Sequence, residues 1–149
     1  MKRCVWKILV ICLCCIAQGV GAQTGKIYTT DMGLSSSLIN QIFQDKQGFV
    51  WVATEYGLNK FDGLRFTNYR HVSADSSSIK NNYVRTLFED SRCNLLIGCI
   101  DGLMKYDRET DTFLEIPMFR AGKRVFPHIT QMQELHNGEI WMTTTGQGM

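Results

Sequence analysis

A repeat with a period of 45 residues constrains the fold of this chain more than any other feature. Residues 39–62 (INQIFQDKQGFVWVATEYGLNKFD) align without gaps with residues 84–107 (VRTLFEDSRCNLLIGCIDGLMKYD). The aligned positions keep their residue type, as in the pairs Phe43 and Phe88, Asp45 and Asp90, Gly57 and Gly102. A third copy begins at Ile129 and brings Trp141 to 90 residues after Trp51, which is two periods. Periods of about 40–50 residues are typical of propeller blades.

Each copy has the local pattern of short strands joined by tight turns. Runs of β-branched, aromatic and other apolar residues end in polar turns, and glycines stand where a sharp turn requires a positive φ. The strands expected are 39–44, 49–54, 58–61, 65–69, 84–89, 94–99, 103–106, 112–116, 129–134 and 140–144. Four antiparallel strands in 45 residues make one blade. We therefore expect an all-β fold: an incomplete β-propeller of about two and a half four-stranded antiparallel blades.

The first 22 residues have the pattern of an export signal. Three basic residues within 1–7 precede an apolar run over 8–17, and small residues lead to a cleavage point after Ala22. A run of ten residues is too short for a membrane helix, which needs about 20. Lipid attachment at Cys12 or Cys14 is the competing interpretation, but each follows a bulky residue where that processing prefers a small one. We expect an exported chain that begins at Gln23 and has no membrane span.

Removing the signal changes the charge and the cysteine count. Three of the sixteen basic residues leave and all fourteen acidic residues stay, so the formal net charge becomes −1. No cluster of Lys and Arg remains, which argues against nucleic-acid binding. Only Cys93 and Cys99 remain, and a strand rising about 3.3 Å per residue would hold them beyond disulfide reach. Two free thiols are expected.

The repeat also decides how we interpret the most prominent polar and aromatic residues. Asp45 and Asp90 are equivalent residues beside turns, so we interpret them as turn caps and not as a catalytic pair. Trp51 and Trp141 lie at mid-strand positions, where packing between blades is favoured over stacking on a sugar. His128 and His136 lack partners at metal-ligand spacing. The sequence therefore predicts no catalytic residue, no metal site and no cofactor, and it leaves the ligand-binding residues unknown.

The repeat resembles that of a known family. The run GFVWVATEYGLNKFDG at 48–63, with Leu34-Ser35-Ser36-Ser37 upstream, closely resembles the two-component regulator propeller repeat. Trp51-Val52-Ala53-Thr54 and Trp141-Met142-Thr143-Thr144 are similar to its tryptophan segment. Residues 96–99 form a weaker copy that lacks the tryptophan, and Cys93 replaces the turn glycine.

The resemblance implies a sensor. Full-length members have two large propellers, an immunoglobulin-like domain, a membrane helix, a histidine kinase, a receiver and a DNA-binding domain. They bind oligosaccharides in the periplasm, switch on genes for polysaccharide use and are expected to form homodimers. This chain would be an N-terminal fragment of the periplasmic sensor region. Its divisions would be 1–22 signal peptide, 23–33 lead-in segment, 34–78 repeat 1, 79–123 repeat 2 and 124–149 a truncated repeat 3.

Two other classes of function stay open at this point. The chain could belong to a propeller-fold carbohydrate-active enzyme, a lyase or hydrolase, whose catalytic residues would be those that break the repeat. These are Glu55, Tyr56, Arg70, His71 and Arg120. It could also be an interaction scaffold. Because no kinase motif is present in the chain, we expect it to have no enzyme activity of its own.

Overall fold

The computed structural model describes residues 25–146, and the predicted export segment lies outside this range. Twelve strands in the described residues form antiparallel sheets, and helical structure there is limited to one 3-10 turn, η1 (Thr30–Met32). The strands are β1 (Ile39–Gln44), β2 (Val50–Thr54), β3 (Gly57–Phe61), β4 (Phe66–Tyr69), β5 (Val84–Glu89), β6 (Leu95–Cys99), β7 (Gly102–Asp107), β8 (Thr112–Ile116), β9 (Met118–Arg120), β10 (Lys123–Val125), β11 (Ile129–Glu134) and β12 (Ile140–Thr144).

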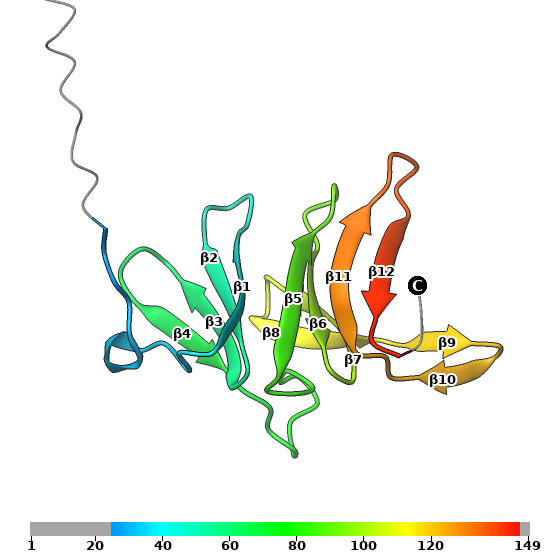
Figure 1. Ribbon diagram of the computed structural model, residues 1–149, viewed down its shortest axis with the longest axis horizontal. Helices are drawn as coiled ribbons and strands as arrows, with labels where there is room; N and C mark the ends of the chain where they lie inside the picture. Colours follow the sequence, from blue (N-terminus) through cyan, green and yellow to red (C-terminus); the bar gives the residue numbers. More distant parts are fainter. Residues whose placement is uncertain (1–24, 147–149) are drawn as a thin grey trace, which may run out of the picture.

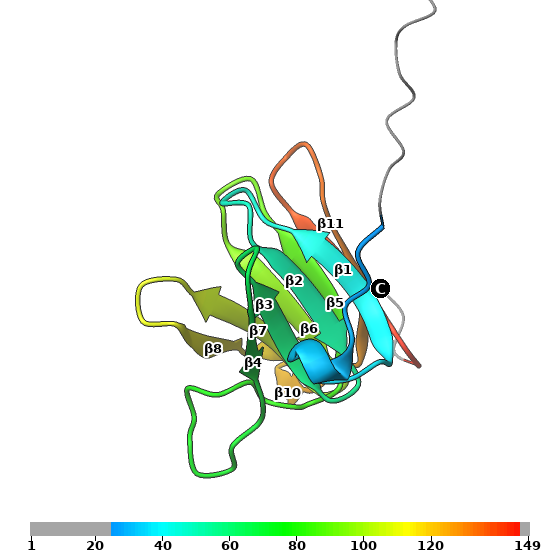
Figure 2. The same ribbon diagram turned by 90° about the vertical axis from the view of Figure 1, so that its left-hand side faces the viewer.

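The strands form two complete blades and part of a third. Blade 1 has the order β1-β2-β3-β4, blade 2 has the order β5-β6-β7-β8, and β11 pairs with β12 in blade 3. The first strands β1, β5 and β11 lie side by side (Figure 1), and from the blade 1 side the sheets lie one behind another (Figure 2). The predicted all-β propeller architecture is confirmed. Five predicted strands, β1, β5, β8, β11 and β12, have the predicted bounds. The strands β2, β3, β4 and β6 differ by one residue at one end, and β7 is one residue longer at each end.

The hairpin of β9 and β10 was not predicted. It projects from the connection between blades 2 and 3 (Figure 1). Its strands are three residues each and are joined by Ala121 and Gly122, both at positive φ. Because each strand has only three residues, Met-Phe-Arg and Lys-Arg-Val, it is too short to show the apolar alternation that indicated the other strands. The boundary predicted between repeats 2 and 3 falls within β10.

The blades pack face to face over two apolar clusters. In the joint between blades 1 and 2, Trp51 is fully buried against Tyr106, with ring centroids 4.8 Å apart. In the joint between blades 2 and 3, Leu96, Leu103 and Ile129 form the buried centre. The packing prediction for Trp51 is confirmed.

Hydrogen bonds between neighbouring blades also follow the repeat. The Glu89 carboxylate accepts a bond of 2.8 Å from the Lys46 backbone N–H, and one period later Glu134 accepts one of 2.7 Å from the Ser91 N–H. The amide of Gln41 bonds twice to Leu87: its Nε2 donates to the carbonyl (3.0 Å) and its Oε1 accepts from the N–H (2.7 Å). The first strands β5 and β11 are thus each anchored to the blade before them.

Candidate ligand-binding groove

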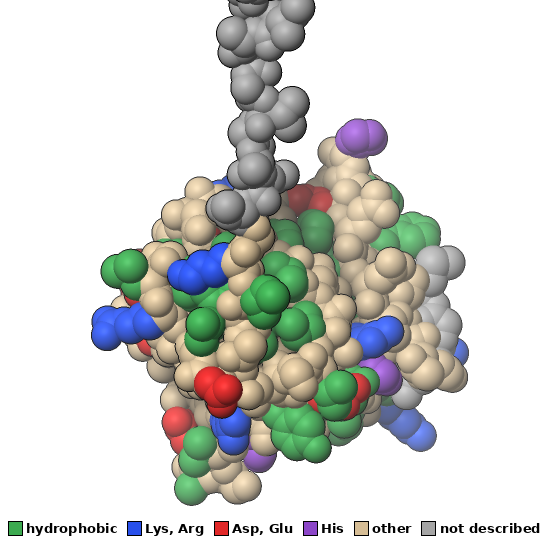
Figure 3. Space-filling view, turned by 60° about the vertical axis from the view of Figure 1, so that its left-hand side comes forward, with side chains coloured by type: hydrophobic (Ala, Val, Ile, Leu, Met, Phe, Trp, Pro, Cys, Tyr) green, Lys and Arg blue, Asp and Glu red, His purple; other side chains and the backbone are tan. Residues whose placement is uncertain are grey.

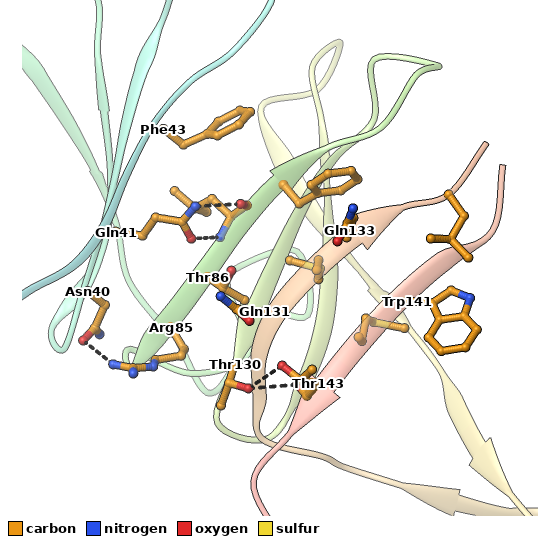
Figure 4. Close-up of a pocket in the computed structure, with 15 residues that line it drawn as sticks. Asn40, Gln41, Phe43, Arg85, Thr86, Thr130, Gln131, Gln133, Trp141 and Thr143 are labelled. Atoms are coloured by element: carbon orange, nitrogen blue, oxygen red, sulfur yellow. Dashed lines mark hydrogen bonds between the residues drawn. The ribbon is translucent and has the colours of Figure 1, made fainter. Parts of the chain in front are cut away.

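A groove of about 830 Å³ runs along the first strands of the three blades (Figure 4). Its walls carry amides and hydroxyls, a guanidinium group, and the ring of Trp141. The polar residues that line it are Asn40, Gln41, Arg85, Thr86, Thr130, Gln131, Gln133 and Thr143. Such side chains can donate and accept many hydrogen bonds, which suits a polyhydroxylated ligand.

One repeat position supplies a different side chain to the groove from each blade. Asn40, Arg85 and Thr130 are 45 residues apart and lie next to the irregularity where each first strand shifts its register. The Arg85 guanidinium donates to Asn40 Oδ1 (3.2 Å), and Asn40 Nδ2 donates to the Val84 carbonyl (2.8 Å). The Arg85 side chain is exposed. We call Asn40, Arg85 and Thr130 the variable ladder. They place an amide, a guanidinium group and a hydroxyl at equivalent positions of the three blades.

Trp141 lines the groove but behaves differently from Trp51. Its ring is half-exposed, because no described residue covers the side of β12 on which it lies. Its indole N–H has only a long bond of 3.4 Å to Glu139. Since Trp51 at the same repeat position is fully buried by a following blade, Trp141 is better explained as a packing residue than as a platform for sugar.

Asp45 caps its turn, as predicted. Its Oδ1 accepts from the backbone N–H groups of Gln47 (3.0 Å) and Phe49 (2.9 Å), and its Oδ2 accepts from the Trp51 indole (2.9 Å). Burial raises the pKa of Asp45, but hydrogen bonds from Arg108 and Trp51 and the charge of Arg108 outweigh it. The pKa of Asp45 therefore lies below its usual value.

Asp90 has the same role with a different partner. Its Oδ1 accepts from the N–H groups of Arg92 (3.0 Å) and Asn94 (2.7 Å). Leu96 replaces the tryptophan here and offers no indole, so the Asn94 side chain donates to Oδ2 instead (2.7 Å). Burial raises the pKa of Asp90, and the bonds from Asn94 outweigh it, so that the net shift is downward. Both carboxylates are engaged by their own turns and are not arranged for catalysis.

Arg108 links the turns of blades 1 and 2, and the sequence reasoning missed it. Its Nη1 lies 2.8 Å from Asp45 Oδ2 and its Nη2 lies 2.8 Å from Glu89 Oε1. The carboxylate of Asp45 is fully buried, and the Arg108 side chain is 20% exposed. Residue 63, one period earlier, is glycine. Arg108 therefore departs from the repeat, and this departure was the sequence feature that could have indicated its role.

The residues proposed for an enzyme do not gather in the groove. Glu55 accepts a bond of 3.2 Å from the Tyr83 hydroxyl, and the following Tyr56 is exposed on its turn. His71 bonds to Asn82 and Ile79, while Arg70 lies beside Gly57. Arg120 lies on the separate hairpin. Four of the five thus lie around the turn at Gly57, whose N–H bonds to the Asn82 carbonyl (2.7 Å), and Arg120 lies apart from them.

The remaining residues discussed from the sequence lie outside the lining of the groove. His128 and His136 lie in the turns before β11 and after it. No group of three or more metal-binding side chains occurs within residues 25–146. Cys93 and Cys99 are free thiols, as predicted, and burial, with the charge of Asp101, raises the pKa of Cys99 to about 12.

Comparison with known proteins agrees with the repeat geometry. Residues 33–56 match the family described as two component regulator propeller. This chain carries the two-component regulator propeller repeat. Histidine kinase P4 of Formosa agariphila is 52% identical over 54 residues, which are 36% of this chain and 4% of that relative.

Two solved structures show the same architecture. The extracellular domain of a putative hybrid two-component system from B. thetaiotaomicron is similar with a TM-score of 0.69 and 31% identity, over 80% of this chain and 17% of that one. The extracellular domain of a putative one-component system from the same organism has a TM-score of 0.63 over 72% of this chain and 15% of that one. At 23% identity, the second likeness shows the fold alone. The chain spans only a small part of each relative. No helix within residues 25–146 is long and apolar enough to cross a membrane.

Proposed function

We propose that this chain is an N-terminal part of the periplasmic ligand-sensing propeller of a two-component receptor, and that the receptor senses an oligosaccharide to regulate polysaccharide-use genes. The repeat and the likeness to extracellular domains of such systems support the receptor class. In the full-length receptor the chain would join further blades and act as a homodimer.

The variable ladder is the observation that supports a ligand in the groove. Positions that serve packing keep an apolar side chain from blade to blade, as at Val52, Ile97 and Met142. Asn40, Arg85 and Thr130 change theirs while facing the same groove, as recognition of a ligand without repeat symmetry requires. Amide, guanidinium and hydroxyl groups are the donors and acceptors that sugar hydroxyls use.

The test is calorimetric titration of the chain with a panel of oligosaccharides from digested polysaccharides. We expect Arg85→Ala to weaken binding about tenfold or more, because a hydrogen bond to a charged group contributes about 1.5–3 kcal/mol. Arg65→Ala is the matched control, since Arg65 is 85% exposed and lies outside the groove. Equal affinity of the wild type and Arg85→Ala for every bound sugar would refute the groove assignment.

Phosphotransfer, in this proposal, belongs to regions of the receptor outside this chain. The chain should therefore not take label from radioactive ATP, whereas a histidine kinase would. Hydrolysis or elimination of any oligosaccharide in the same panel, abolished by His71→Ala or Glu55→Gln, would instead support the enzyme alternative.

A further inference from the structure

The lining of the groove carries a positive charge and no negative one. Of the fifteen described residues that line it, Arg85 alone is charged at neutral pH, and none is an aspartate or a glutamate. The joint between blades 1 and 2 differs in this respect, because Arg108 lies there 2.8 Å from both Asp45 and Glu89. The groove therefore presents a guanidinium group with no carboxylate in the described lining. Figure 3 shows that acidic and basic side chains are otherwise interspersed on the side of the molecule it presents.

The neighbours of Arg85 on both sides along the groove are neutral. Figure 4 shows its side chain between Asn40 of blade 1 and Thr130 of blade 3. Asn40 Nδ2 donates to the Val84 carbonyl (2.8 Å), and the Thr130 hydroxyl bonds to the Thr143 hydroxyl (2.8 Å). These two polar groups are thus engaged within the protein and supply no counter-charge for Arg85.

The guanidinium group of Arg85 keeps most of its donors for a ligand. Its N–H groups form a planar fork, and one of them, on Nη1, donates to Asn40 Oδ1 at 3.2 Å. Within residues 25–146 the Nε and Nη2 groups have no hydrogen-bond partner. These two groups form one edge of the fork, which can donate two parallel bonds to the oxygens of an anion. The bond to Asn40 orients this edge.

The backbone directs this side chain into the groove. The pairing of β5 with β6 shifts its register between Val84 and Thr86, so Arg85 is the extra residue of a bulge. A bulge re-aims a side chain away from the regular alternation of a strand. Val84 and Thr86 are buried, whereas Arg85 between them is exposed. Position 85 therefore has no packing role in the described blades.

We propose that the oligosaccharide bound in the groove is acidic, and that Arg85 binds its carboxylate or sulfate group. This inference rests on the proposed function, since it names the class of sugar that the groove takes. A guanidinium fork matches the oxygens of such an anion and pairs with them more strongly than with neutral hydroxyls. The described lining holds no carboxylate that would repel the ligand.

The test is calorimetric titration of the chain with digests of uronic-acid polysaccharides and of sulfated polysaccharides. Each uronic-acid digest is compared with its carboxyl-reduced form, and each sulfated digest with its desulfated form. We expect an acidic form to bind about tenfold or more tightly than its neutral counterpart. The pair that shows this preference identifies the group bound as carboxylate or sulfate. Because Arg85 is exposed, the preference should shrink as salt is raised.

Arg85→Gln separates the ion pair from the other contacts of the groove. It should weaken binding of the acidic form about tenfold and change affinity for the neutral form by less than about threefold. Arg92→Gln is the matched control, because it removes the same charge from the same blade. Arg92 is exposed and lies outside the groove lining. Circular dichroism verifies that both variants keep the strand content of the wild type.

The outcomes separate this inference from the proposed function. Equal or tighter binding of the neutral forms, or equal losses for both forms in Arg85→Gln, would overturn the inference and leave the proposed function standing. A preference for acidic forms that Arg92→Gln also abolishes would show a general charge effect and overturn the site at Arg85. Failure of every oligosaccharide to bind would overturn both.

Discussion

Cys93 has a left-handed backbone conformation, and the equivalent residue in the other two repeats is glycine. Cys93 has φ +64, while Gly48 and Gly138 have φ +93 and +82 in the same turn. The Asp90 cap, with two backbone bonds, keeps this turn formed despite the side chain. The unusual residue is therefore tolerated at a cost in stability.

Cys93→Gly should stabilise the chain by about 0.5–1 kcal/mol. The left-handed conformation costs a non-glycine residue roughly 1–2 kcal/mol, which the substitution removes. Glycine has more conformational freedom in the unfolded chain, and this lowers the gain by about 0.5–1 kcal/mol. Urea unfolding measures the change. The matched control is Gly48→Ala, which should destabilise blade 1, since nothing within 4 Å would obstruct the methyl group and only backbone strain acts. A lower urea midpoint for Cys93→Gly would contradict the argument.

Asp45→Asn should lower the free energy of unfolding by about 3 kcal/mol, because it leaves the largely buried Arg108 without one of its two carboxylate partners. Asp90→Asn should cost less, since Asp90 forms hydrogen bonds but no ion pair with Arg108. Equal losses for the two variants would show that Arg108 adds nothing to the joint.

The ion pair between Asp45 and Arg108 also makes the stability of the chain depend on pH. The pKa of Asp45 is lowered in the folded state, so its contribution is complete above the unfolded value of about 3.9 and is lost as pH falls through the folded value. The difference in stability between the wild type and Asp45→Asn should therefore be constant from about pH 5 to 7 and shrink below pH 4. Urea unfolding at each pH measures this difference. A difference that grows below pH 4 would contradict the lowered pKa of Asp45.

At the scale of strands and blades, glycine sets how closely blades 2 and 3 approach. A Cβ added at Gly98 would lie 2.6 Å from Thr86 Cγ2 and 3.1 Å from Ile129 Cβ. Ala53 is the equivalent residue in blade 1 and is fully buried, so that joint accepts a methyl group. The two joints therefore share a pattern but differ in spacing.

Gly98→Ala should destabilise the chain by about 1–3 kcal/mol through overpacking. Thr86→Ser removes the methyl group in closest contact, so the double variant should recover part of the loss and the two changes should not add. Thermal unfolding of the four proteins of this cycle measures the coupling. Strict additivity would mean that Ile129 of blade 3, and not Thr86 beside Gly98 in blade 2, obstructs the added methyl group.

The period of 45 was enough to predict the strands of the blades, because residues such as Trp51 and Leu87 recur at positions with a fixed environment. It also predicted the turn caps at Asp45 and Asp90. The hairpin of β9 and β10 breaks the repeat, and its three-residue strands are too short to show a pattern of burial from which to predict it. The groove was not predictable either, since Asn40 and Arg85 come together only when neighbouring blades pack.

For the whole molecule, burial distinguishes the two tryptophans within the described residues. In dilute protein, acrylamide should quench the half-exposed Trp141 several-fold more strongly than Trp51, which is fully buried. Variants Trp51→Phe and Trp141→Phe assign the two signals, since Trp6 lies in the predicted export segment. Equal quenching of the two tryptophans would contradict this difference in burial.

The contacts that complete blade 1 also impose an order in time. The Lys46 N–H cannot form its hydrogen bond until Glu89, 43 residues later, has been synthesised. Asp45 cannot bind Arg108 until a further stretch of chain, 63 residues beyond Asp45, is complete. At about 5–20 residues per second, synthesis leaves blade 1 unfinished for several seconds while Trp51 has nothing to cover it. The nascent chain therefore exposes the apolar face of blade 1 to aggregation for several seconds. A holdase that binds residues 39–61 until residue 113 has emerged would raise the yield of folded protein.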